Sequence, residues 1–447
     1  MKKRILRAAA LLLSLACFVL PAAAAGEAVA LRGIAEDSVP DANGIGAAAV
    51  WNIENETFVY EHNVDAPLAP ASLTKLMTAV CAYEVLGGRM DETLTVEYSM
   101  IAAASGNQVG YYVGETVTVR DLFGGLLTRG ANDCAYLLAY AADGGTDAFV
   151  ARMNEKAAAL GMDMTVYKNP TGMNAEGAVT TARDAVRIAE AFNAIPALTA
   201  LSGAVQYEMP ATNKASARII YNRNALVSRV SETGYFDARV TGLNAGSTAE
   251  SGYYAASAVG SETLHYIIVV LGAAEAEGKN LAYTYTSRLA GYALSRFGYI
   301  EVIKDSGAVC ELPVTLSSTA DYVALVPAST LTLYLPLATD VDTELVKTVR
   351  LDRESLEAPV EAGQVVGVYS VSRDGELLGS VELVTKNALP RSEFLVVLQA
   401  IEDFTTGVFF LSTCAAAVVL TLVYFLIRAL WRRRAGRRSA PRRYRSR

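Results

Sequence analysis

The stretch Ala69-Pro-Ala-Ser-Leu-Thr-Lys75 places a serine and a lysine three residues apart, at Ser72 and Lys75. On a helix, this spacing puts the two side chains next to each other. If burial removes the solvation of the charged amine, its pKa falls, and the amine can accept the serine proton near neutral pH. The stretch therefore predicts a serine nucleophile that needs no histidine. Such a pair also occurs on ordinary solvated helix faces, so the rest of the sequence must show whether this pair is catalytic.

An apolar stripe continues from this pair. Its members recur at helical spacing and are Leu73, Leu76, Met77, Val80 and Tyr83. This stripe predicts a helix held in a core, with its first turn available to a cleft.

Apolar segments of strand length lie on both sides of the helical part of the chain. Residues 47–51 and 58–62 are predicted to form an opening hairpin, and residues 253–259 and 264–272 a second pair. Thr181 with Asp184 three residues later predicts a capped helix start between them. We therefore expect an α/β layered fold whose antiparallel sheet is assembled from distant pieces of the chain.

The beginning of the chain has the layout of a cleavable secretory signal, which we assign to residues 1–25. Four basic residues precede the apolar run 8–20, and small residues follow at 22–25. The signal predicts that the rest of the chain is exported.

The other end of the chain predicts a membrane anchor. Residues 408–427 carry no charge and are long enough to cross the roughly 30 Å hydrocarbon core of a bilayer. The last twenty residues, 428–447, hold ten arginines and no acid, so we expect a cytoplasmic tail and an extracytoplasmic main domain. A buried helix followed by a nucleic-acid-binding arm is the alternative, which the secretory signal disfavours.

Charge and composition narrow the classes of partner. All 46 acidic residues lie between the signal and the span, where 25 of the 39 basic residues remain, so the exported part has a net charge near −21. Nucleic acid is therefore an unsuitable partner. The two histidines, His62 and His265, give poor support for a zinc peptidase or a Ser-His-Asp hydrolase. We expect no metal and no cofactor.

The exported part divides by its hydrophobic pattern. Residues 26–297 combine the predicted strands and helices, and residues 298–390 are dominated by short alternating runs typical of a small β-domain. Residues 391–407 are predicted to form an amphipathic juxtamembrane helix.

Beyond the Ser72 segment, a series of short stretches extends over nearly the whole exported length: Gly114-Glu115, Arg120-Asp-Leu122, Ala131-Asn-Asp133, Asn169-Pro-Thr-Gly172, Thr181-Ala-Arg-Asp184, Thr241-Gly242, Ala358-Pro-Val360 and Ala362-Gly-Gln-Val-Val-Gly367. With these stretches, in this order, the chain resembles the penicillin-binding D-alanyl-D-alanine carboxypeptidases. The resemblance implies a layered fold like that of β-lactamases and transpeptidases. It also implies peptidoglycan stem peptides as substrates and β-lactams as covalent inhibitors.

The family implies three active-site motifs, of which Ser-x-x-Lys alone is intact. In the second, Gly130 stands where a serine is expected, so no hydroxyl is present there to relay a proton, while Asn132 can still hold a substrate amide. Ser105-Gly106-Asn107 matches the pattern of the second motif, but it precedes Gly114-Glu115, whereas the family's motif follows that stretch. We therefore interpret it as a chance match.

The third motif is assigned to Val240-Thr-Gly242, with Val240 in place of the expected lysine. Arg239 is adjacent, but neighbouring strand residues face opposite sides, so it replaces that lysine only if a bulge redirects it. The resemblance implies that Thr241 and Gly242 bind substrate and that the amides of Ser72 and Leu243 stabilise the oxyanion.

Three functional classes remain. The first is a serine-type D-alanyl-D-alanine carboxypeptidase with weakened turnover. The second is a non-catalytic relative that binds wall peptide or a membrane partner. The third, a β-lactamase or esterase, is disfavoured because no acidic deacylation motif is evident and because the predicted membrane tether suits a wall substrate.

Overall fold

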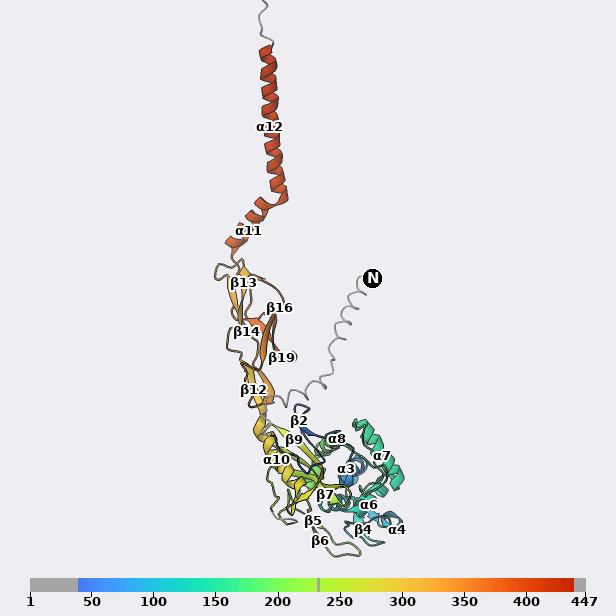
Figure 1. Cartoon of the computed structure of the whole chain (residues 1–447). Helices are drawn as coiled ribbons and strands as arrows, with labels where there is room; N and C mark the ends of the chain where they lie inside the picture. The colour runs from blue at the N-terminus through green and yellow to red at the C-terminus, as the bar shows by residue number, and fades with distance from the viewer. Residues whose placement is uncertain (1–38, 231–233, 438–447) are drawn as a thin grey trace, which may run out of the picture. The chain divides into compact units, whose positions relative to one another are not determined.

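The computed structural model describes residues 39–230 and 234–437. The chain divides into two compact units (Figure 1). The first extends to Ile300 and includes Leu333–Glu344, and the second comprises Glu301–Thr332 and the chain from Leu345 onward. The predicted signal at 1–25 and the final ten residues of the predicted tail lie outside the described residues.

A five-stranded antiparallel sheet forms the centre of the first unit. Its order is β2-β1-β9-β8-β7, and the strands are β1 (Ala47–Asn52), β2 (Thr57–His62), β7 (Val240–Thr248), β8 (Gly252–Gly260) and β9 (His265–Ala273). Ala49 pairs with Glu61 on one side and with Val269 on the other. The prediction of a sheet assembled from distant segments is thus confirmed, as are both predicted strand pairs.

Both faces of this sheet are buried. Ala47 and Ala49 belong to a core with the helices α3 (Thr74–Leu86), α6 (Asn132–Asp143), α7 (Thr146–Ala159) and α8 (Ala182–Asn193). Ala48 and Val50 belong to a second core with α10 (Leu281–Arg296). Alternate residues of a strand face opposite sides, so burial of both faces explains the continuous apolar runs in the sequence. Figure 1 shows α10 and α8 on the two sides of the sheet.

Short elements complete the first unit. They are η2 (Ala71–Leu73), η3 (Gly87–Arg89), β3 (Thr93–Thr95), α4 (Tyr98–Ile101), β4 (Thr116–Thr118), α5 (Val119–Gly124), η4 (Gly125–Arg129), α9 (Pro196–Ser202), β5 (Gln206–Met209), β6 (Arg218–Tyr221), β10 (Glu275–Ala276) and β11 (Lys279–Asn280). The predicted cap of α8 is present, because the Thr181 side chain accepts a hydrogen bond from the Asp184 amide at 3.1 Å.

The second unit contains a six-stranded sheet of order β16-β18-β19-β14-β13-β17. Its strands are β13 (Cys310–Thr315), β14 (Tyr322–Pro327), β16 (Val346–Leu351), β17 (Leu356–Glu357), β18 (Val365–Arg373) and β19 (Glu376–Thr385). A separate pair consists of β12 (Phe297–Ile303) and β15 (Leu331–Pro336). The small all-β domain predicted after the first domain is present, and its predicted start at residue 298 falls within β12.

Two helices end the described chain, α11 (Glu393–Thr406) and α12 (Val408–Arg437). Val408–Arg433 has a mean hydropathy of 2.3 and is long and apolar enough to cross a membrane. The helix continues beyond the predicted end of the span at residue 427, so the first ten residues of the basic segment are helical.

Candidate active site

Ser72 and Lys75 lie beside each other, with 3.0 Å between Lys75 Nζ and Ser72 Oγ. Ser72 belongs to the single turn η2, and α3 begins directly after it at Thr74. Lys75 Nζ also donates a hydrogen bond to the Thr171 carbonyl oxygen at 2.7 Å. These two contacts direct the amine of Lys75 toward the hydroxyl.

The environment of Lys75 favours a neutral amine. The side chain is only 1 % exposed, and this burial lowers the pKa of Lys75 from its ordinary value to about 7. The nearby Cys134 thiol would oppose this shift if it ionised, but burial raises the pKa of Cys134 well above its usual range. A substantial fraction of the lysine is therefore unprotonated at neutral pH.

The loop 169–172 fixes the backbone just before the serine. Asn169 Oδ1 accepts hydrogen bonds from the Thr171 amide, the Thr171 hydroxyl and the Gly172 amide. Gly172 has a φ of +75°, and a Cβ atom there would lie 1.7 Å from the Ala71 carbonyl oxygen. Ala71 itself adopts a φ of 45°, which is rare for a residue other than glycine. Asn169-Pro-Thr-Gly172 is one of the stretches that carry the family resemblance. It thus binds the Lys75 amine through the Thr171 carbonyl oxygen, and its Gly172 lies against the turn that carries Ser72.

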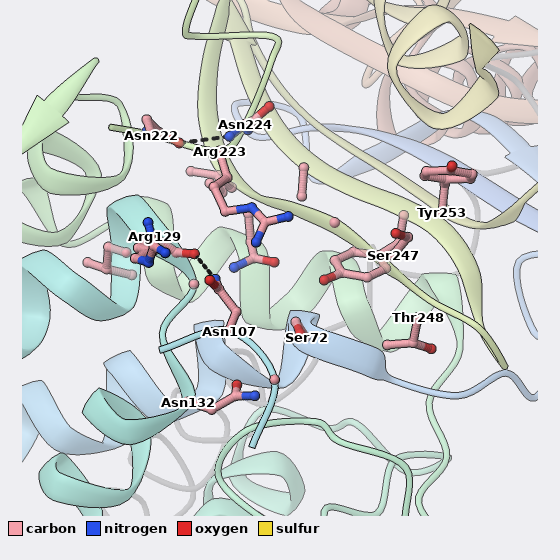
Figure 2. A pocket seen from close by; sticks show the side chains of 18 of the residues that line it. Ser72, Asn107, Arg129, Asn132, Asn222, Arg223, Asn224, Ser247, Thr248 and Tyr253 are labelled. Carbon is pink, nitrogen blue, oxygen red and sulfur yellow. Dashed lines mark hydrogen bonds between the residues drawn. The ribbon is translucent and has the colours of Figure 1, made fainter. Parts of the chain in front are cut away.

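Ser72 faces a cleft of about 500 Å³. Figure 2 shows its hydroxyl among polar side chains contributed by several segments. The segments that line the cleft are 106–107, 127–130, 222–224, 243–250 and 253–254, together with Asn132, Met173, Ser202, Asn280 and Tyr283. Among the described residues, no group of His, Cys, Asp and Glu side chains is arranged to hold a metal ion.

The second motif lies on one side of this cleft. Gly130 ends η4 with a φ of 69°, and Asn132 begins α6. Asn132 Nδ2 donates to the Ser105 carbonyl oxygen at 2.6 Å. Its buried Oδ1 has no hydrogen-bond partner among residues 39–230 and 234–437. An acceptor in this state is suited to receive a donor from a ligand.

The segment Ser105-Gly106-Asn107, interpreted from its order in the chain as a chance match, also reaches the cleft. Gly106 and Asn107 line it, and the Asn107 side chain donates to the Arg129 carbonyl oxygen (Figure 2). The backbone amide of Asn132 donates to the Asn107 carbonyl oxygen at 2.7 Å. The segment therefore supports the second motif, although Ser105 itself is not among the lining residues.

The stretch Val240-Thr-Gly242, assigned to the third motif, does not line the cleft. Thr241 is exposed and donates its hydroxyl to the Ala258 carbonyl oxygen, and neither Thr241 nor Gly242 lines the cleft. Val240 is buried in the core that contains α10. Leu243 is the one predicted residue of this strand that reaches the site, because a bulge between Gly242 and Asn244 shifts the register of β7.

The lining segment of β7 therefore begins further along the chain than the sequence interpretation placed it. Asn244-Ala-Gly246 faces the cleft and repeats the x-x-Gly pattern four residues later. That repeat is a sequence signal for the segment that lines the cleft, but the Thr-Gly pair of residues 241–242 matches the expected motif better.

Arg223 is a second residue that the sequence interpretation did not identify. It lines the cleft between Asn222 and Asn224, and Figure 2 shows its side chain extending toward the middle of the site. Its amide donates to the Thr128 carbonyl oxygen at 3.1 Å. Arg223 forms no ion pair among the described residues, so its charge is available to an anionic group.

Comparisons with known proteins identify the family. The model of the D-alanyl-D-alanine carboxypeptidase family matches residues 38–275, and that of the penicillin-binding protein 5 C-terminal domain matches residues 297–391. The chain belongs to the D-alanyl-D-alanine carboxypeptidase family, as its sequence motifs suggested.

Relatives of known name match most of the chain. D-alanyl-D-alanine carboxypeptidase DacF of Bacillus subtilis is 26% identical over 354 residues, covering 78% of this chain and 87% of the relative. DacA of Escherichia coli is 26% identical over 343 residues, covering 75% and 81%. The solved structure of DacD from Francisella tularensis covers 80% of this chain and 96% of its own, with 21% identity and a TM-score of 0.58. This structural likeness establishes the fold.

Proposed function

We propose that the chain is a serine-type D-alanyl-D-alanine carboxypeptidase that removes the terminal D-alanine from peptidoglycan stem peptides. The observation that carries this proposal is the 3.0 Å contact between Ser72 Oγ and a buried Lys75 amine at the edge of a polar cleft. Nucleophile and base within hydrogen-bonding distance are the requirement for acyl transfer by a serine.

The reaction starts with Lys75 Nζ taking the proton of Ser72. Ser72 Oγ attacks the carbonyl carbon of the penultimate D-alanine, the peptide C–N bond breaks, and the proton passes to the departing amine of terminal D-alanine. Water then hydrolyses the ester and releases the shortened peptide. The Ser72 amide is assigned to the oxyanion, and Asn132 to a substrate amide. The second oxyanion donor moves from Leu243 to the amide of Ser247, which follows Gly246 as Leu243 follows Gly242 and also lines the cleft.

Substrate binding in this proposal uses the residues that line the cleft. Asn244-Ala-Gly246 takes the place of the third motif, and because Asn244 carries no charge, Arg223 supplies the cation for the terminal carboxylate. Thr241 and Gly242, first assigned to substrate, support the strand instead.

A non-catalytic protein that binds wall peptide is the second candidate. Gly130 in place of the relay serine and the uncharged Asn244 on the cleft strand favour it, because both alter groups that assist the departing amine or the terminal carboxylate. The intact Ser72 and Lys75 contact favours the enzyme.

Two assays on the full-length protein in detergent separate the candidates. Incubation with penicillin followed by intact-protein mass spectrometry tests whether Ser72 forms an ester, with Ser72→Ala as control. Release of D-alanine from a stem pentapeptide tests turnover. An adduct without D-alanine release would favour the binding protein, and release that persists in Ser72→Ala would contradict the proposed nucleophile.

We also propose that α12 anchors the protein as a single span, with the catalytic unit outside the cell membrane and the arginine-rich end in the cytoplasm. Protease added outside intact spheroplasts should remove the catalytic unit and leave a C-terminal epitope tag protected. Loss of the tag under these conditions would contradict this orientation.

A further inference from the structure

Asn107 lies beside the place that the missing serine of the second motif would fill. Gly130 stands at that serine position, and a Cβ atom added there would have Asn107 Nδ2 as its nearest neighbour, at 3.6 Å. Asn107 also lines the cleft that Ser72 faces. The segment 105–107, interpreted from its order in the chain as a chance match, thus brings a polar side chain to the position where the family's hydroxyl is absent.

Two backbone contacts hold Asn107. Its Nδ2 donates a hydrogen bond to the Arg129 carbonyl oxygen, and its own carbonyl oxygen accepts one from the backbone amide of Asn132 at 2.7 Å (Figure 2). Because a carbonyl can only accept, the nitrogen of the carboxamide, and not its oxygen, faces Arg129. These contacts therefore determine which end of the side chain is left for a ligand.

The oxygen of this carboxamide has no partner within the protein. Among residues 39–230 and 234–437, Asn107 Oδ1 forms no hydrogen bond. It is an acceptor on the wall of the same cleft that Ser72 and Asn132 line. A stem peptide has one donor at its reacting bond, the N–H of the terminal D-alanine. An acceptor next to Gly130 is suited to this N–H, since Gly130 itself contributes no polar side chain.

We propose that Asn107 Oδ1 accepts the N–H of the scissile peptide bond and so positions the departing amine for protonation. This inference rests on the proposed function, because it needs Ser72 as nucleophile and a peptide as substrate. Asn107 is thereby a positioning residue, and it compensates in part for the hydroxyl that Gly130 lacks.

The proton transfer explains why the position of this nitrogen matters. As Ser72 Oγ bonds to the carbonyl carbon, amide resonance ends and the nitrogen gains a lone pair. The proton that Lys75 took from Ser72 passes to this lone pair while the C–N bond breaks, and D-alanine leaves as an amine. With the N–H held by Asn107, the lone pair keeps one direction during the transfer.

Penicillin separates this role from a purely structural one. Its reacting nitrogen is bonded to three carbon atoms and carries no hydrogen, so Asn107 Oδ1 has no donor to bind there before the lactam bond breaks. A residue that only shapes the cleft would affect penicillin and the peptide alike. The proposed role affects the peptide alone.

The test compares Asn107→Ala with the unchanged full-length protein in detergent. The kcat for D-alanine release from a stem pentapeptide should fall about tenfold, with little change in KM, because a hydrogen bond to the reacting nitrogen is lost. The rate of penicillin adduct formation, followed by intact-protein mass, should equal that of the unchanged protein.

The matched control is Gln108→Ala. Gln108 is the next residue, and its side-chain amide also donates to a backbone carbonyl oxygen, that of Ala104 at 3.1 Å, but it does not line the cleft. This variant should release D-alanine and form the penicillin adduct at the rates of the unchanged protein.

A rescue experiment tests whether Asn107 and residue 130 serve the same nitrogen. In the Asn107→Ala background, Gly130→Ser should recover part of the lost kcat, because its hydroxyl can contact that nitrogen. Gly130→Ala in the same background has the same backbone strain at a φ of 69° without a hydroxyl, and should recover nothing. Equal kcat values for the two double variants would overturn the inference.

The single variant can also contradict the inference. An unchanged kcat in Asn107→Ala would overturn it and leave the proposed function intact. An equal fall in D-alanine release and in adduct formation would show that Asn107 only supports the cleft, and would overturn it too. No D-alanine release by the unchanged protein would overturn the proposed function, and this inference with it.

Discussion

The two sides of the cleft differ in how they depend on the rest of the fold. On the nucleophile side, Ser72 and Lys75 are held by α3, which belongs to the buried core, and by the loop 169–172, whose Thr171 is fully buried. On the substrate side, Gly130 and the β7 segment from Asn244 to Gly246 line the open cleft. The expected residues persist on the first side, whereas on the second side Gly130 and Asn244 stand where a serine and a lysine are expected. Gly130, Ala245 and Gly246 are partly exposed, and substitutions at such positions cost less stability than changes among buried, hydrogen-bonded groups.

On the nucleophile side, removal of the base Lys75 should give the largest change in the acylation rate. Lys75→Ala should slow penicillin adduct formation by about 10² to 10⁴, the usual contribution of a general base. Lys75→Arg should not rescue the rate, because the guanidinium stays protonated. Mass spectrometry over time measures both variants. A rate near that of the unchanged protein would show that another group deprotonates Ser72.

The support beneath the nucleophile is tested next. Gly172→Ala would place a Cβ atom 1.7 Å from the Ala71 carbonyl oxygen. The variant should therefore have a lower melting temperature, and its acylation rate should fall by about tenfold or more. Gly144→Ala is its control, because Gly144 has a similar φ of +73° but nothing within 4 Å of the added atom. If the two variants behaved alike, backbone conformation and not the close approach would explain the effect.

On the substrate side, Arg223→Gln should raise KM for a stem pentapeptide by roughly 10- to 100-fold, because a charge-assisted hydrogen bond to the terminal carboxylate is lost. Arg223→Lys should recover part of the loss. The penicillin adduct of Arg223→Gln, formed at saturating inhibitor, serves as control for an intact nucleophile. An unchanged KM would exclude Arg223 as the carboxylate anchor.

The pH dependence of the acylation rate follows from the protonation state of Lys75. Since the neutral amine is the active form and the pKa of Lys75 is about 7, the acylation rate should rise about tenfold per unit below pH 7 and level off above it. The rate of adduct formation between pH 5 and 9 measures this profile. A rate that falls as pH rises through 7 would require the protonated amine.

The smallest effect expected is that of restoring the missing hydroxyl. Gly130→Ser fits spatially, because the nearest atom to an added Cβ is Asn107 Nδ2 at 3.6 Å. Its φ of 69° strains any side chain, so D-alanine release should rise by less than about tenfold. Gly130→Ala has the same strain without a hydroxyl and isolates the relay. If Gly130→Ser and Gly130→Ala released D-alanine equally, the hydroxyl would have no part in turnover.

The sequence by itself determined the local features. The contact of Ser72 with Lys75, the cap at Thr181 and the apolar length of α12 all follow from residues close together in the chain. Their physical basis is helical spacing and hydrophobicity, which a sequence displays directly. The strand pairs were also predictable, because their apolar runs are continuous.

Only the tertiary structure decided which residues meet at the cleft. The bulge after Gly242 moves Asn244-Ala-Gly246, and not Thr241, into the site, since a register shift changes which strand residues face it. Arg223 and Tyr254 line the same cleft as Ser72 although they lie far from it in the chain, and no local pattern encodes such an arrangement. The packing of distant strands and loops around one serine sets the chemistry that its sequence motif makes possible.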